Sequence, residues 1–324
     1  MSKYILRRLI MTIPTLVVIS MIIFVVLRVI PGNIVATMLG GGGGGGGEGV
    51  QMVDPAAIEK LMSDLRLDRP LYEQYLHWAR GIVTGDLGDS FFRGQKVSEM
   101  LRNHGPVTLQ ISIMAIALSW IVGLPIGILS AARQDSFMDY STRLFVVLFL
   151  AIPSFWLAAL IVLFGVLIFE YYPPLFYSHI WDDPGANLAK TTAPAIVIGL
   201  GMAAMIARMA RSSILEVLRE DYVRTAMAKG LASRVVMWRH VIKNALLPVI
   251  TIAGIMMGFT LGGSVAVEYA FAINGLGVTM LTAIIDKDFN VVQNLVMIYA
   301  AAFVIINLLI DLSYAWADPR IRYE

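Results

Sequence analysis

The sequence predicts an all-α membrane protein with about six spanning helices, and two observations support this prediction. Hydrophobic residues make up 58% of the 324 residues and charged residues only 15%, well below the roughly 25% charged residues of soluble domains. The apolar residues also lie in long blocks, close to the about 20 residues with which a helix crosses a hydrocarbon core. This pattern is typical of a polytopic membrane protein and not of a soluble domain.

Six blocks provide the expected spans. Five of them carry no charge and lie at 9–27, 107–132, 144–169, 244–267 and 289–310. The sixth, at 191–207, is shorter, but its apolar periodicity continues to about residue 215, past Arg208 and Arg211. We expect these two arginines to reach the membrane surface with their long side chains. The first block is too long for the apolar region of a signal peptide and is interpreted as the first span.

The basic residues predict which side of the membrane each connection faces. If the N-terminus lies in the cytoplasm, the inner side holds most of the lysines and arginines, including those between 219 and 243. The two short outer loops then carry one lysine each, Lys190 and Lys287. Because inner loops are enriched in Lys and Arg, we expect both termini in the cytoplasm.

The blocks divide the chain into four segments. The expected segments are a cytoplasmic end with the first span at 1–30, an outer segment at 31–106, a membrane core at 107–316 with an inner loop at 217–247, and a cytoplasmic tail at 317–324.

The outer segment begins with a low-complexity stretch. Eight consecutive glycines at 40–47 favour a flexible tether. A phosphate loop would need a lysine and a hydroxyl directly after the glycines, and Glu48, Gly49 and Val50 supply neither. We expect short helices at 55–67 and 71–82, followed by a turn at 85–88.

The inner loop contains the most informative pattern. Asp221 is a plausible N-cap for a helix at 222–229, and Gly230 suits the left-handed position that ends a helix. Ser233 is expected to cap a second helix, on which the apolar residues Leu231, Val235, Trp238 and Ile242 would share one face. Such a segment fits either a groove on a cytoplasmic partner or the surface of an anionic membrane, and periodicity alone leaves both open.

The residues of this loop resemble a known family. Residues 221–231 read Asp-Tyr-Val-Arg-Thr-Ala-Met-Ala-Lys-Gly-Leu, and His240, Asn244 to Pro248 and Thr251 follow. This segment resembles the coupling loop of ABC-importer permeases of the dipeptide, oligopeptide and nickel branch. Similar fragments elsewhere are Tyr-Ile-Leu-Arg-Arg-Leu at 4–9, Gly-Asp-Leu-Gly at 85–88, Pro-Val-Thr-Leu at 106–109, Ile-Pro-Ser-Phe at 152–155 and Asp-Pro-Arg-Ile-Arg at 318–322.

The resemblance implies a type I importer permease of the bacterial inner membrane, without catalytic residues of its own. The implied partners are a second homologous permease subunit, two cytoplasmic ABC ATPase subunits that bind ATP and Mg, and a periplasmic solute-binding protein. It implies no cofactor in this chain and no nucleic acid. The expected ATPase-coupling residues are Asp221, Tyr222, Val223, Arg224, Thr225, Ala226, Met227, Ala228, Lys229, Gly230 and Leu231. His240, Asn244 and Pro248 are expected to join the loop to the membrane.

Two departures from the family pattern concern the sites. The branch usually has arginine where Met227 stands, and Pro-Gly where Ile273 and Asn274 stand. The first change removes one possible ion pair with an ATPase subunit. The second weakens any assignment of that outer turn.

Polar and kinking residues within the spans are candidates for the solute pathway. They are Pro153, Ser154, Asn307 and Asp311. An acid within a span is by default a functional candidate, but pairing of Asp311 with Arg208 or Arg211 is the favoured, structural interpretation. The prolines are equally expected as tolerated kinks.

Other classes of membrane protein fit less well. The histidines are His77, His104, His179 and His240, which are scattered, so no metal site is expected. There is no Gly-x-x-x-x-Gly-Lys-Ser/Thr motif for nucleotide hydrolysis. A proton-coupled transporter would have several acids within its spans, and only Asp311 qualifies. The cargo stays open between peptides, nickel chelates, glutathione and sugar-like compounds.

Overall fold

The computed structural model describes residues 2–29, 68–170, 172, 174 and 177–317. The helices of this part, in chain order, are α1 (Ser2–Val29), α4 (Leu71–Thr84), α5 (Val97–Ala132), α6 (Phe137–Ala151), α7 (Ser154–Phe169), α8 (Pro184–Val217), α9 (Asp221–Ala228), α10 (Ser233–Val235), the π-helix η2 (Val236–Val241), α11 (Ile242–Gly263), α12 (Val265–Ala270), α13 (Leu276–Ile285) and α14 (Phe289–Ala317). The expected helix at 55–67, the glycine run and the tail from residue 318 lie outside the described residues.

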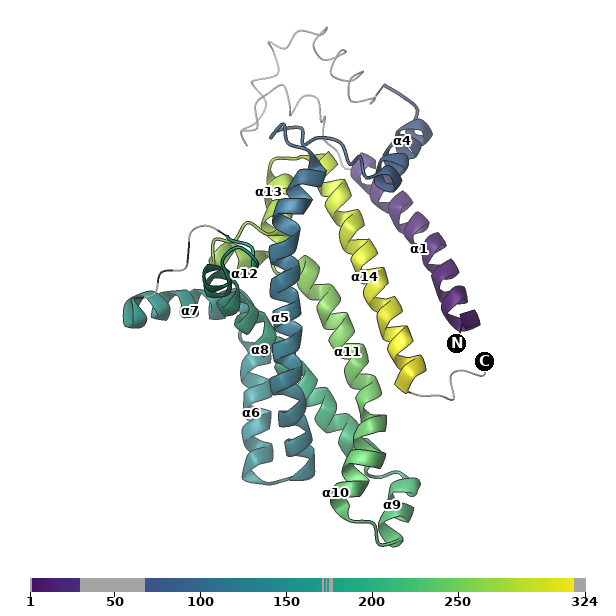
Figure 1. Ribbon diagram of the computed structural model, residues 1–324, viewed down its shortest axis with the longest axis vertical. Helices are drawn as coiled ribbons and strands as arrows, with labels where there is room; N and C mark the ends of the chain where they lie inside the picture. Colours follow the sequence, from purple (N-terminus) through teal and green to yellow (C-terminus); the bar gives the residue numbers. More distant parts are fainter. Residues whose placement is uncertain (1, 30–67, 171, 173, 175–176, 318–324) are drawn as a thin grey trace.

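The long helices run roughly side by side, so that the molecule has two ends (Figure 1). One end carries α4 and α13, and the opposite end carries α9 and the turn between α5 and α6. We call these the α4 end and the α9 end. Among the described residues, five helical stretches are long and apolar enough to span a membrane, namely Arg7–Val29, Val97–Ala132, Pro184–Val217, Ser233–Gly262 and Phe289–Tyr314. The all-α polytopic fold expected from the sequence is therefore confirmed.

The block at 144–169 does not form one straight span, which corrects the prediction. It is divided between α6 and α7, whose axes differ by 97°. The break falls at Ile152 and Pro153, both of which have extended backbone angles. Proline has no N–H to donate to the preceding turn and disfavours helical geometry in the residue before it. The pair therefore counts as a span only if the two helices are taken together.

α5 and α8 form the centre of the bundle because small side chains let their backbones approach closely. A Cβ atom added to Gly123 would lie 2.5 Å from the carbonyl oxygen of Ala203, and one added to Gly127 would lie 2.6 Å from that of Ala207. Small residues spaced four apart are a usual basis for packing between membrane helices. α5 also begins at Val97, ten residues before the apolar block that predicted it.

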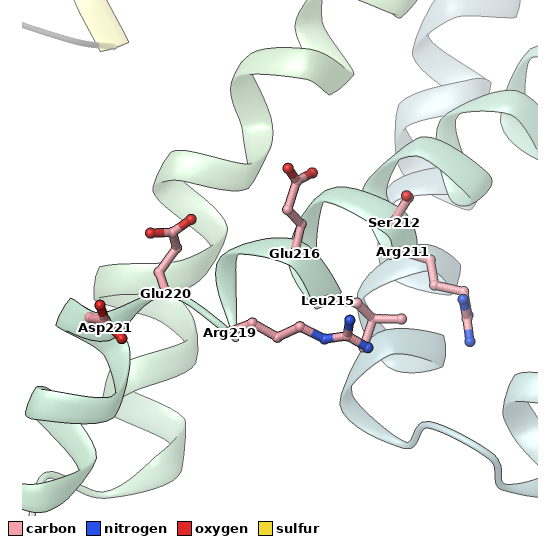
Figure 2. A pocket seen from close by; sticks show the side chains of 7 residues that line it. All are labelled: Arg211, Ser212, Leu215, Glu216, Arg219, Glu220 and Asp221. Carbon is pink, nitrogen blue, oxygen red and sulfur yellow. The ribbon is translucent and has the colours of Figure 1, made fainter.

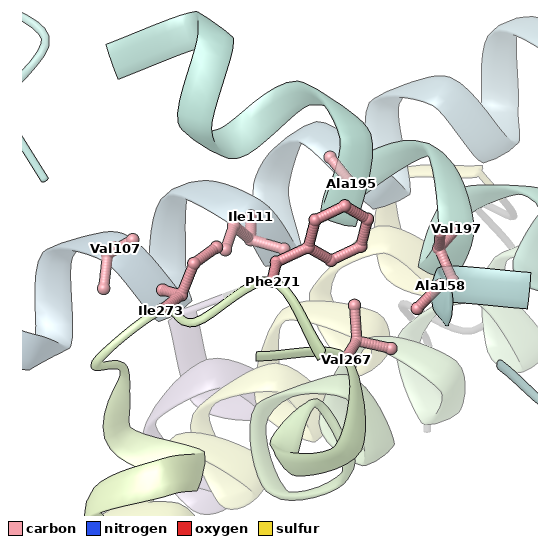
Figure 3. Close-up of a cluster of buried hydrophobic side chains, with 8 residues drawn as sticks. All are labelled: Val107, Ile111, Ala158, Ala195, Val197, Val267, Phe271 and Ile273. Carbon is pink, nitrogen blue, oxygen red and sulfur yellow. The ribbon is translucent and has the colours of Figure 1, made fainter. Parts of the chain in front are cut away.

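A buried apolar cluster joins α5 and α8 to α7 and to α12 (Figure 3). It consists of Val107, Ile111, Ala158, Ala195, Val197, Val267, Phe271 and Ile273. The side chain of Phe271 lies among residues from α5 and α8. This cluster fixes the segment that follows α11 against the centre of the bundle, although the sequence pattern assigned that segment to an outer loop.

At the α4 end, aromatic residues hold α4 against α1 and α14. The Tyr75 hydroxyl lies 2.9 Å from that of Ser20, and the Phe24 ring packs edge-on against Tyr75 and stacks on Trp78. Trp78 donates to Asn294 at 3.1 Å. The predicted helix at 71–82 is confirmed, with two further residues, and Gly85 ends it with a left-handed φ of 80°.

Candidate docking segment and solute-facing cavity

The short helix α9 is attached to the protein by one face and exposes the other. Val223 and Ala226 are buried, at 0% and 8% exposure, and pack in a cluster with Val236, Val241 and residues of α5, α8 and α11. Asp221 and Arg224 form only an exposed ion pair, at 3.6 Å. The other predicted coupling residues on this helix point outward: Tyr222, Thr225, Met227, Ala228 and Lys229 are exposed.

The start of α9 differs from the prediction, and its end agrees with it. Asp221 is the first helical residue and Glu220 occupies the N-cap position, without a side-chain hydrogen bond. Gly230 has a φ of +79°. Gly230 N–H donates to Met227 O at 2.9 Å and Leu231 N–H to Ala226 O at 3.4 Å, which is the Schellman pattern that ends a helix at a left-handed residue.

The second helix of the segment has a different register from the predicted one. Ser233 is its first residue, and no side-chain hydrogen bond caps it. From Val236 to Val241 the chain is a π-helix, in which bonds from i to i+5 replace the usual ones. Val236 and Val241 are therefore buried together, whereas Leu231, Val235 and Trp238 of the predicted apolar face are 42%, 43% and 60% exposed. Ile242, the fourth residue of that face, is buried at 6% exposure, so the four residues do not share one environment. A π-segment has no signature in a periodicity of 3.6, and the sequence pattern could not indicate this change of register.

Two of the predicted joint residues contact α9 directly. Asn244 Nδ2 donates to the Tyr222 hydroxyl at 2.8 Å and to the His240 carbonyl at 3.0 Å. The Tyr222 hydroxyl in turn donates to the same carbonyl at 3.4 Å. This three-residue contact connects α9 to the start of α11. Pro248, the third predicted joint residue, lies within α11, one turn further on.

A charged groove lies beside α9, at the end of α8 (Figure 2). It has a volume of about 490 Å³ and is lined by Arg211, Ser212, Leu215, Glu216, Arg219, Glu220 and Asp221. In Figure 2 the carboxylates of Glu216 and Glu220 point to one side of the backbone, and Arg211 points away from them toward neighbouring helices. The groove and the exposed face of α9 together form a concave, charged surface at the α9 end.

A buried carboxylate supports this surface from within the bundle. Asp139 is 0% exposed and accepts from Arg211 Nε at 2.7 Å, Arg211 Nη2 at 2.9 Å and Arg143 Nη2 at 2.7 Å. The Ser130 hydroxyl also donates to it, at 2.5 Å. Asp139 thus connects α5, α6 and α8. Arg211, with 21% of its side chain exposed, is therefore paired with Asp139 inside the bundle.

Asp311 pairs with a different residue from those expected. Its carboxylate lies 3.0 Å from Arg8 Nη1. Arg211 instead forms an ion pair with Asp139, and Arg208 is exposed on α8. The ion pair joins α14 to α1, two helices that pack side by side. The expectation of a structural ion pair is met, with Arg8 as the partner.

A cavity of about 370 Å³ lies at the bend between α6 and α7. Its lining comes from α6, α7, α8, α11 and α12 and includes Ser154, Gly201, Met202, Met256, Phe259, Thr260 and Ser264. Of the four residues predicted for the solute pathway, only Ser154 lines it. Pro153 forms the bend beside it, and Asn307 and Asp311 lie on α14, away from this lining.

The sequence pattern missed a second buried acid, Glu268. It is 1% exposed, and it accepts from the hydroxyls of Thr108 and Ser264, each at 2.8 Å, and from Val278 N–H at 3.0 Å. Thr108 also accepts from Leu276 N–H at 2.8 Å. These bonds fix the chain reversal between α12 and α13 to α5. The only sequence signal was an acid one residue beyond an apolar block.

Polar residues of α5, of α8 and of the segment before α8 form a further network, which is partly buried. Gln110 and Asn187 exchange side-chain hydrogen bonds, at 2.5 and 3.1 Å, and the Tyr177 hydroxyl donates to Gln110 at 3.1 Å. Burial raises the pKa of Tyr177. Within the part of the chain that the structure describes, no three His, Asp or Glu side chains come together as a metal site requires.

Solved structures share this arrangement of helices. The chain is similar to an amino acid ABC transporter, with 15% identity, a TM-score of 0.52, and 66% of this chain and 91% of the other covered. It is also similar to the MetNI methionine ABC transporter in inward-facing conformations, with 19% identity, a TM-score of 0.51, and 68% and 96% covered. The fold is that of the transmembrane subunits of ABC importers.

Sequence comparison then gives the family. The chain belongs to the binding-protein-dependent transport system inner membrane components, whose model matches residues 123–323, while the model of their N-terminal region matches residues 1–112. Three relatives are similar over the full length of both chains. They are the di/tripeptide transport system permease protein DppB of Pseudomonas aeruginosa, at 35% identity, the dipeptide transport system permease protein DppB of Escherichia coli, at 33%, and a putative peptide transport system permease protein of Brucella abortus, at 33%. The protein is a multi-pass permease subunit of an ABC importer.

Proposed function

We propose that this chain forms half of the translocation pathway for a peptide-like solute in the bacterial inner membrane. A second, homologous permease subunit would form the other half, a periplasmic binding protein would deliver the solute, and two cytoplasmic ATPase subunits, which bind ATP and Mg, would drive transport. The full-length relatives named as dipeptide and di/tripeptide permeases support a peptide-like cargo. A nickel chelate is the alternative within the same branch.

The geometry of α9 is the observation that carries the proposal. Val223 and Ala226 attach the helix to the bundle, and its opposite face, with Arg224, Met227 and Lys229, is exposed. A helix that is fixed on one side and exposed on the other can transmit a push from a partner to α8 and α11. The Tyr222 contact with His240 and Asn244 provides a direct connection to α11. We assign the α9 end to the cytoplasm, where the ATPases bind.

The absence of cysteine from the sequence allows a direct test of docking and orientation. Met227→Cys places a single thiol on the exposed face of α9, and Thr84→Cys places one at the α4 end. We expect Met227→Cys to form a cross-link to an ATPase subunit and to react with a membrane-impermeant thiol reagent only after permeabilisation. Thr84→Cys should form no cross-link to an ATPase subunit. It should react with the thiol reagent without permeabilisation. Cross-linking of the ATPase at position 84 would reverse the assigned orientation.

Gly230 allows a test of the mechanical connection. We expect Gly230→Leu to abolish ATP-coupled uptake while membrane insertion is retained, because a left-handed residue with a side chain costs roughly 1–2 kcal/mol and the end of α9 would move. The space around Gly230 is open, so the effect would not come from a steric clash. Gly230→Asn is the matched control, since asparagine adopts this conformation more readily, and it should retain most uptake. Equal uptake by the wild type and Gly230→Leu would contradict the connection.

The cargo is tested separately from the docking. Uptake of labelled dipeptides and of a nickel chelate would be measured in cells that express the complete complex and its binding protein. We expect competition by unlabelled dipeptides. Competition by the nickel chelate alone would favour the alternative cargo and would leave the assignment as a permease subunit intact.

A further inference from the structure

A second cavity lies at the α4 end, away from α9 and from the bend between α6 and α7. It has a volume of about 560 Å³. Its walls are the end of α1, the helix α4, the turn that follows α4, and the start of α14. Lining residues that matter here are Arg28, Trp78, Arg80, Asp86, Asp89 and Gln293. None of them belongs to the sites described above.

Two buried hydrogen-bond donors in this lining have no partner among the described residues. Gln293 is only 5% exposed, and within this part of the chain its Nε2 atom has no hydrogen-bond partner. Arg28 Nε is likewise buried without a described partner. Buried polar atoms are nearly always hydrogen-bonded in folded proteins, so such exceptions call for an explanation. Because both groups are donors, the cavity suits an acceptor such as a phosphate or carboxylate oxygen.

The charges of the lining are balanced. Arg28 and Arg80 contribute two positive charges, and Asp86 and Asp89 contribute two negative ones. Among the described residues neither aspartate forms an ion pair with the protein, and Asp86 accepts only a long bond from Gly88 N–H at 3.4 Å. A purely anionic ligand would leave the two carboxylates uncompensated. A ligand that carries both a phosphate and an ammonium group matches the donors and the acids together.

The position of the cavity favours a lipid as the source of such a ligand. Arg28 lies in the last turn of α1, where Val25, Val26 and Val29 are 54%, 52% and 73% exposed. α1 packs only against α14 and α4 among the helices with substantial contacts, so these valines face the surroundings of the bundle. Tryptophan and arginine are frequent where a span meets the headgroup region. Acyl chains could therefore lie along α1 while the headgroup enters the cavity.

We propose that this cavity binds the zwitterionic headgroup of a phospholipid of the phosphatidylethanolamine type. The phosphate would accept from Arg28 and Gln293, and the ammonium group would lie near Asp86 and Asp89. The bound lipid would fill the space between α1, α4 and α14 and stabilise their packing. With the orientation proposed above, this is a lipid of the outer leaflet.

The test measures lipid binding and does not depend on transport. The complex would be purified from membranes in mild detergent, delipidated, and titrated with phosphatidylethanolamine, with phosphatidylglycerol and with glycylglycine while bound molecules are counted by native mass spectrometry. We expect phosphatidylethanolamine to bind most tightly. Arg28→Gln and Gln293→Met should each weaken that binding about tenfold, which corresponds to about 1.4 kcal/mol. Arg102→Gln, which removes an exposed arginine of α5 outside the cavity, is the matched control and should leave binding unchanged.

Three results would overturn the proposal. Equal binding of phosphatidylethanolamine to the wild type and both cavity variants would mean that the lipid binds elsewhere on the complex. Tighter binding of phosphatidylglycerol would exclude recognition of the ammonium group. Displacement of lipid by glycylglycine in a manner that depends on Arg28 would indicate a soluble zwitterion as the ligand. If the complex with Arg28→Gln does not assemble, lipid binding by the Gln293→Met complex tests the proposal. Methionine has nearly the same shape as glutamine, so this variant should fold.

Discussion

The two ends of the bundle each contain a buried carboxylate, and the two are compensated in different ways. At the α9 end, Asp139 accepts from two arginines, at 2.7 Å each, and its charge is neutralised within the bundle. At the α4 end, Glu268 accepts only from hydroxyls and a backbone N–H among the described residues. The first arrangement braces three helices beneath the docking segment. The second arrangement fixes a chain reversal through uncharged donors alone. It predicts that the Glu268 site tolerates the loss of its negative charge better than a change in the space around the carboxylate.

The largest effect is expected for Asp139→Asn. Removal of one partner of a buried ion pair leaves uncompensated charge and costs about 3–5 kcal/mol of unfolding free energy. Thermal unfolding of the purified complex in detergent, followed by tryptophan fluorescence, would measure the loss. Asp135→Asn is the matched control, because Asp135 contacts the same Arg143 at 3.2 Å but is 64% exposed, and an exposed pair contributes only about 0–1 kcal/mol. Similar losses of stability in both variants would show that the ion pairs of Asp139 do not stabilise the packing of α5, α6 and α8.

Gly275→Ala tests the shape of the Glu268 site. A Cβ atom at this position would lie 2.5 Å from the Glu268 carboxylate, which three hydrogen bonds hold in place. The carboxylate would have to move, and overpacking of this kind costs about 1–3 kcal/mol. Gly262→Ala is the matched control, since nothing lies within 4 Å of its added Cβ. An equal stability of the two variants in the same unfolding assay would mean that the carboxylate adapts freely.

Glu268→Gln tests the charge of the same site and should have a smaller effect. The amide oxygen can still accept from Thr108 or Ser264, while the amide nitrogen faces a donor and loses one hydrogen bond, at a cost of about 1 kcal/mol. A loss as large as that of Asp139→Asn would contradict the contrast between the two ends. Glu268→Leu, which removes all the acceptors, should be the more damaging change.

Much of the fold could be predicted because hydrophobic blocks and the left-handed glycine have strong local signals. Five spans and the end of α9 at Gly230 follow from these signals. The burial of Asp139 and Glu268 could not be predicted, because both lie outside the apolar blocks and so resemble loop residues. The bend at Pro153 was ambiguous for a related reason, since many spanning helices tolerate proline. The partner of Asp311 and the π-helix depend on three-dimensional packing, which residue spacing does not encode.

The smallest effect is expected for a substitution in α9 itself. Tyr222→Phe removes the hydroxyl that connects α9 to His240 and Asn244, and one such hydrogen bond contributes about 0.5–1.5 kcal/mol. We expect nearly normal stability and ATPase binding, but less solute transported for each ATP hydrolysed, because α9 would follow α11 less closely. Tyr72→Phe, which removes an exposed hydroxyl of α4, should leave that ratio unchanged. A ratio unchanged in both variants would mean that the apolar contacts of Val223 and Ala226 are sufficient to transmit the movement.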